Sequence, residues 1–129
     1  MAYIHDDGGR SKYFPKNSHN GDCVLRACAI ATGMDYMRTM KRLFELGLEI
    51  GDLPNGEPVY EAFLLENGFV KNKPPRVFKR KIPIRSWVPQ APAGDIVALT
   101  RSHLVAIVDN VQRDTWLDER TVNSWWHRA

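Results

Sequence analysis

The chain has 129 residues, of which 43% are hydrophobic and 26% are charged, a composition typical of one globular domain with a modest core. No apolar run approaches the roughly 20 residues of a membrane-spanning helix, and the first residues have neither the basic flank nor the apolar core of a secretory signal. The formal net charge of +3 is compatible with an acidic partner but does not by itself indicate one. We therefore expect a cytoplasmic protein that does not bind membranes.

The first 22 residues are rich in Gly, Asp, Asn and Ser. This composition predicts an extended arm or loop, with residues 1–16 as an N-terminal arm. The rest of the chain, residues 17–129, is expected to form a single domain.

A short helix is predicted over residues 23–33, where an alanine-rich apolar segment follows a polar loop. Asp22 is a favourable N-cap residue and Gly33 suits the C-cap, which places Cys23 in the first turn. The backbone N–H groups and the helix dipole there lower the pKa of a thiol, so Cys23 is a candidate nucleophile. Cys28 lies among apolar neighbours in mid-helix and is expected to be buried. Two cysteines on one short helix are poorly placed to form a disulfide, so both are expected as free thiols.

Two more helices are expected, over residues 35–46 and 57–67. Apolar side chains recur in both at helical spacing. Asp35 suits the N-cap of the first, and Pro58 suits the first turn of the second. Together with the preceding helix they make a helical part over about residues 17–68.

The later part of the chain, about residues 76–126, predicts strands. The expected elements are an edge strand near Val77-Phe78, a short strand or turn over 84–88, two strong strands over 95–99 and 103–108, a hairpin tip at Asp109-Asn110, a returning strand over 111–116 and a last strand over 121–126. Helices followed by an antiparallel sheet predict the α+β class.

His103 begins one of the strong strands and shares a face with Val105. If the hairpin turns at residues 109–110, Asp114 lies opposite Val105 and diagonal to His103, at about 7–8 Å between Cα atoms. A carboxylate there can hold the imidazole in one tautomer and orientation. Asp118 is the alternative orienting acid, because a slip of one residue in the hairpin exchanges the two faces.

The order of cysteine, histidine and acid, with helices before a sheet, resembles the papain-like cysteine peptidases. It is most similar to small bacterial and phage members related to bacteriocin-leader peptidases. Their first motif is an amide side chain, five residues and a cysteine, here Asn17 and Cys23. Their second motif is a histidine followed by hydrophobic residues, a turn and an aspartate, here His103 to Asp114. The resemblance covers roughly residues 17–126.

The resemblance implies a papain-like fold and a hydrolase, most simply a peptidase or isopeptidase that forms an acyl-enzyme. It implies that Cys23 is the nucleophile, that His103 is the general base and acid, and that Asp114 orients His103. Asn17 and the N–H of Cys23 would form the oxyanion hole. The chain departs from the family in having Asn17 where glutamine is usual and Val24 where glycine is usual.

The remaining expectations concern ligands and partners. Trp116, which the hairpin places opposite His103, and Asn20 are candidates for substrate binding, the substrate being a peptide or protein. No metal site and no cofactor are expected, because Cys23 and Cys28 lack the spacing of a zinc site. The basic stretch 71–85 is a candidate surface for an acidic substrate, a protein partner or phosphates. No recognised nucleic-acid module surrounds it, so nucleic acid is not the expected partner.

Two alternative functions stay open at this point. One is a non-catalytic interaction module on the same fold, which the shortened amide at Asn17 and the basic stretch 71–85 favour. The other is related thiol chemistry, such as amide hydrolysis of cell-wall peptides, acyl transfer or transglutamination.

Overall fold

The computed structural model describes residues 3–14 and 21–129. The helices are α1 (Arg10–Tyr13), α2 (Cys23–Thr32), α3 (Tyr36–Ile50), α4 (Glu57–Glu66), α5 (Ile84–Trp87) and the short 3-10 helix η1 (Val88–Gln90). The strands are β1 (Tyr3–His5), β2 (Val70–Asn72), β3 (Arg76–Val77), β4 (Arg80–Lys81), β5 (Asp95–Thr100), β6 (His103–Val108), β7 (Val111–Asp114) and β8 (Ser124–Arg128). None of the helices in the described ranges is both long and apolar enough to cross a membrane.

Six of the strands form one sheet in the order β1-β7-β6-β5-β8-β2, and the α+β prediction is confirmed. The C-terminal strands β5 to β8 pair antiparallel, as predicted, but the whole sheet is mixed, because β1 from the expected arm pairs in parallel with β7. β2 also lies outside the expected sheet part and pairs with β8. Both strands have three residues and little burial, so neither shows the alternating pattern that identifies a strand in a sequence.

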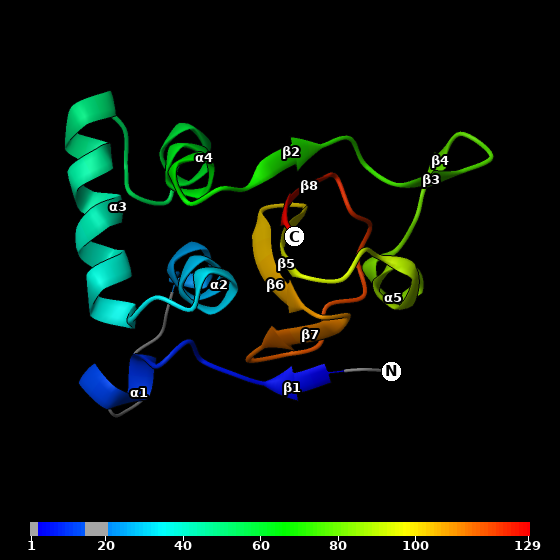
Figure 1. Ribbon diagram of the computed structural model, residues 1–129, viewed down its shortest axis with the longest axis horizontal. Helices are drawn as coiled ribbons and strands as arrows, with labels where there is room; N and C mark the ends of the chain where they lie inside the picture. The colour runs from blue at the N-terminus through cyan, green and yellow to red at the C-terminus, as the bar shows by residue number, and fades with distance from the viewer. Residues whose placement is uncertain (1–2, 15–20) are drawn as a thin grey trace.

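The sheet has a hydrophobic core on each face. Helices α2, α3 and α4 cover one face, whereas α5 and η1 cover the other (Figure 1). Trp126 packs in the first core and Trp125 against the second, as expected for neighbours in a strand. α2 packs between α3 and strand β6, and this position brings its first turn to the start of β6.

Several boundaries differ from the predictions. α3 continues to Ile50 instead of stopping at residue 46, and it ends at Gly51, whose φ of 86° suits a C-cap. The stretch predicted as a short strand or turn over 84–88 forms α5 and the start of η1, because Ile84, Trp87 and Val88 bury one helical face. The last strand covers 124–128 instead of 121–126.

The strand predicted near Val77-Phe78 is present as β3, but it does not belong to the main sheet. β3 and β4 pair only with each other and form a separate two-stranded hairpin. All residues from 76 to 81 are exposed, and the hairpin extends beyond α5, away from α2, in Figure 1.

Candidate active site

Cys23 is the first residue of α2, as predicted, and Gly33 closes the helix with a φ of 73°. The prediction that the side chain of Asp22 caps this helix is wrong. Its carboxylate instead accepts bonds from Arg26, from Arg10 at 3.2 Å and from the Tyr36 hydroxyl at 2.9 Å. In the bonds to Arg10 and Arg26 both the donor and the acceptor are charged, and these two ion pairs hold the carboxylate in the different orientation.

The thiol of Cys23 is partly buried against the start of β6. Burial raises its pKa, but hydrogen bonds from His103 and from the N–H of Leu104 lower it, as do the positive charges of His103 and Arg26. The net effect is a pKa below that of an ordinary thiol. A nucleophilic cysteine requires this direction of shift.

His103 lies between Cys23 and Asp114. Its Nε2 is 2.6 Å from Oδ2 of Asp114, which leaves Nδ1 as the ring nitrogen for Cys23. Burial lowers the pKa of His103, but its bonds to Asp114 and Cys23 outweigh burial and raise the pKa to about 9. A lowered cysteine pKa beside a raised histidine pKa favours the thiolate–imidazolium pair over the neutral pair.

The hairpin between β6 and β7 has the predicted register. Val108 pairs with Val111, and the turn residues Asp109 and Asn110 have φ values of 47° and 64°. Both values lie in the left-handed region that two-residue hairpin turns of this type require. The expected proximity of Asp114 to His103 is therefore confirmed.

The carboxylate of Asp118 bonds to groups other than the imidazole of His103. Asp118 is fully buried, and its carboxylate accepts bonds from the Thr100 hydroxyl and from both the backbone and the guanidinium of Arg120. Burial raises its pKa, but the bonds from Arg120 and Thr100 lower it below the ordinary value. Of the two acids left open by the sequence, Asp114 is the one that binds the histidine.

Asp118→Asn is expected to destabilise the fold by about 1–3 kcal/mol, because it removes the charge that pairs with Arg120 and leaves a buried polar group poorly bonded. Urea unfolding measures this loss. The pH dependence of Cys23 alkylation should stay unchanged, whereas Asp114→Asn should move it. A shift in Asp118→Asn as large as that in Asp114→Asn would contradict the assignment of Asp114.

Arg26 belongs to the site, although the sequence analysis did not identify it. It is 7% exposed, and its guanidinium joins Asp22 to Oδ1 of Asp114, the latter at 3.3 Å. It therefore connects the loop before the nucleophile to the acid that binds His103. The sequence does contain one signal for this role, because Arg26 lies between the apolar residues Leu25 and Ala27. Burying an arginine there without a charged partner would cost folding free energy, so a partner is indicated.

Trp116 also adjoins His103, but not as a cross-strand neighbour, because β7 ends at Asp114. The centroids of the two rings are 4.6 Å apart, with an angle of 33° between the planes. The guanidinium carbon of Arg120 lies 5.1 Å from the indole centroid. Trp116 is 43% exposed, so it presents an aromatic surface beside the imidazole.

Two expected site residues, Asn17 and Asn20, lie outside the described residues. In the ranges 3–14 and 21–129, no three His, Cys, Asp or Glu side chains are grouped closely enough to hold a metal ion. Cys28 is fully buried, as expected, and burial raises the pKa of its thiol far above the ordinary value.

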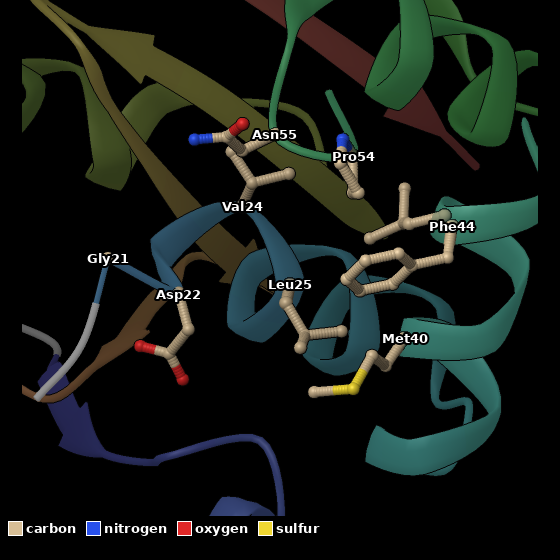
Figure 2. Close-up of a pocket in the computed structure, with 9 residues that line it drawn as sticks. Gly21, Asp22, Val24, Leu25, Met40, Phe44, Pro54 and Asn55 are labelled. Atoms are coloured by element: carbon tan, nitrogen blue, oxygen red, sulfur yellow. The ribbon is translucent and has the colours of Figure 1, made fainter. Parts of the chain in front are cut away.

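An apolar pocket of about 230 Å³ opens beside the start of α2. Figure 2 shows Val24 of α2, Met40 and Phe44 of α3, and Pro54 around it. Gly21 and Asp22, which directly precede Cys23 in the chain, complete one edge.

Comparison with known proteins does not assign the chain to a family. No protein-family model matches the chain, and searches of curated proteins and of solved structures found no match. The function must therefore be argued from the chemistry of the site.

Proposed function

We propose that the chain is a papain-like cysteine hydrolase, acting as a peptidase or isopeptidase through Cys23, His103 and Asp114. The observation that carries this proposal is the position of His103, which bonds to the carboxylate of Asp114 and lies close enough to the thiol of Cys23 to lower its pKa. A nucleophile, a base and a group that orients the base are the parts that nucleophilic catalysis requires. A helix that begins at the cysteine and packs on a strand that begins with the histidine resembles the papain-like arrangement and supports the proposal.

The reaction begins with attack of the Cys23 thiolate on the substrate carbonyl carbon, which forms a C–S bond. The tetrahedral intermediate collapses, the C–N bond breaks, and His103 gives its proton to the leaving amine. Water then attacks the thioester while His103 takes one of its protons. The C–S bond breaks, the acid product leaves, and the thiolate and imidazolium are restored.

The oxyanion of each intermediate needs hydrogen-bond donors. The N–H of Cys23 lies in the first turn of α2, where backbone N–H groups have no acceptor within the helix. In this proposal it donates to the oxyanion together with the side-chain amide of Asn17.

The pocket at Val24 and Phe44 and the exposed ring of Trp116 are the proposed contacts for substrate. The pocket is apolar, and Gly21 and Asp22, the two residues before Cys23, line one edge of it. It can therefore hold an apolar side chain of the substrate near the scissile bond. Trp116 also covers His103 and limits access of water to the ring.

The test uses a pool of tryptic peptides incubated with the full chain, with new termini located by mass spectrometry. The wild type should cleave a subset of peptides, and Cys23→Ala should cleave none. Cys28→Ala is the matched control and should cleave at the wild-type rate. Cleavage retained in Cys23→Ala would contradict the proposal, and a wild-type pool that is left intact would contradict peptidase activity.

The pH dependence of hydrolysis should be bell-shaped. The rate rises as the Cys23 thiol ionises, below the pH at which an ordinary thiol does, because its pKa is lowered. The rate falls as the pH rises through about 9, because His103 then loses the proton that it gives to the amine. Initial rates on one cleaved peptide measure both limbs. A rate that keeps rising above pH 9 would show that His103 does not supply this proton.

A further inference from the structure

The β3–β4 hairpin, residues 76–81, is the most strongly charged element that the proposed chemistry does not use. Between residues 73 and 81 the chain has five basic residues and no acidic one. None of the five forms a salt bridge with an acid in the described ranges, in contrast to Lys71, which pairs with Glu57, and Arg85, which pairs with Glu119. The five are Lys73, Arg76, Lys79, Arg80 and Lys81.

The tip of the hairpin has a strained backbone. Phe78 and Lys79 have φ values of 50° and 68°. Residues other than Gly, Asn and Asp rarely adopt this left-handed backbone conformation, because it is strained for them. Arg76 lies directly opposite Lys81, and like charges in that relation repel each other. The ring of Phe78 is 95% exposed and so gains little from packing within the chain. These features are explained if the hairpin makes contact with a partner.

The pairing register of β3 and β4 determines which side chains share a face of the hairpin. Arg76 and Lys81 are cross-strand partners and share one face of the hairpin, whereas Val77 and Arg80 share the other. Positive charge is therefore present on both faces, and Phe78 lies between them at the tip. A partner that satisfies all of these groups must offer negative charge on two sides and a less polar surface between them.

We propose that the β3–β4 hairpin binds in the major groove of duplex DNA. This groove is about 12 Å wide and admits a two-stranded β-ribbon. Phosphates on its two walls meet the cations on both faces, and the base edges and thymine methyl groups on its floor meet Phe78. An acidic protein surface would more naturally meet only one face of the hairpin. The proposal departs from the sequence-based expectation, because the sequence showed the charges but not their arrangement on two faces.

The experiment measures binding of the full chain to a fluorescein-labelled 20-base-pair DNA duplex of mixed sequence by fluorescence anisotropy. The wild type should bind with a micromolar dissociation constant at about 50 mM salt and more weakly at about 200 mM, because cations displace counterions from the phosphates. The double variant Lys79→Glu/Arg80→Glu should bind at least about tenfold more weakly, with a log–log salt slope smaller by about 2. Phe78→Ala should weaken binding about threefold to tenfold.

Matched controls separate the hairpin from general surface charge. Arg38→Glu/Lys41→Glu reverses two exposed cations on α3, and Leu48→Ala removes another exposed apolar side chain. The α3 reversal should weaken binding much less than the hairpin reversal does, and Leu48→Ala should leave it unchanged. Circular dichroism checks that every variant is folded.

Three results would overturn the proposal. The first is no binding to the duplex at 50 mM salt, and the second is an equal loss in the α3 control. The third is equal binding to an RNA duplex of the same sequence, whose major groove is too narrow for a ribbon. Hairpin-dependent binding to a poly-glutamate peptide without binding to DNA would assign the surface to an acidic protein instead. Cys23→Ala should bind DNA like the wild type, so this test is independent of the proposed hydrolysis.

Discussion

Replacing His103 by alanine is expected to lower peptide hydrolysis by a factor of about 10²–10⁴, the usual contribution of a positioned acid–base group. The variant loses the proton donor for the leaving amine and also the partner that lowers the pKa of Cys23. Burial of the thiol then loses the largest interaction that opposes it, so the pKa of Cys23 should rise. Initial rates on one cleaved peptide, compared at pH 6 and pH 8, measure the loss.

His127→Ala is the matched control for this variant. His127 lies on β8, and its Nε2 bonds to the carbonyl of Ala93, away from the candidate site. It should hydrolyse the same peptide at nearly the wild-type rate. If His103→Ala were as active as His127→Ala, His103 would not be the acid–base group.

Replacing Arg26 by methionine is expected to destabilise the fold by about 3–5 kcal/mol, the usual cost of removing one partner from a buried ion pair. The variant removes the guanidinium that joins the two acids, so that Asp114 keeps His103, and Asp22 keeps Arg10 and Tyr36. The free energy of unfolding in urea at pH 7 measures the effect. The remaining folded protein should also have a less acidic Cys23 thiol, because the charge of Arg26 lowers its pKa.

Arg42→Met is the control for Arg26→Met. Arg42 also bonds to carboxylates, at 2.7 and 2.8 Å to Glu66, but on an exposed surface of α3. Exposed ion pairs contribute little to stability. Arg42→Met should therefore lower the free energy of unfolding much less than Arg26→Met does. Equal losses would mean that Arg26 does not act as a buried bridge between Asp22 and Asp114.

The sequence predicted the parts of this site that depend on local pattern. Gly33 and the alanine-rich segment locate α2, and the turn at residues 109–110 fixes the register that places Asp114 near His103. Both signals act over a few residues, where propensity and alternation are informative.

The features that the sequence missed depend on contacts between distant parts of the chain. β1 has three residues and is a strand only because β7 offers it an edge. Arg26 is buried because Asp114, 88 residues later in the chain, pairs with it. The choice between Asp114 and Asp118 also needed the tertiary structure, because Thr100 and Arg120 hold Asp118 elsewhere.

The central claim is that Cys23 is a thiolate activated by His103. The most direct test is the rate of alkylation by iodoacetamide between pH 4 and 9, with the adduct located by mass spectrometry. We expect Cys23 to react at a pH well below the ordinary thiol pKa of about 8.5, to lose this reactivity in His103→Ala, and to leave the buried Cys28 unlabelled. Slow labelling of Cys23 with an ordinary pH profile, unchanged in His103→Ala, would contradict the claim.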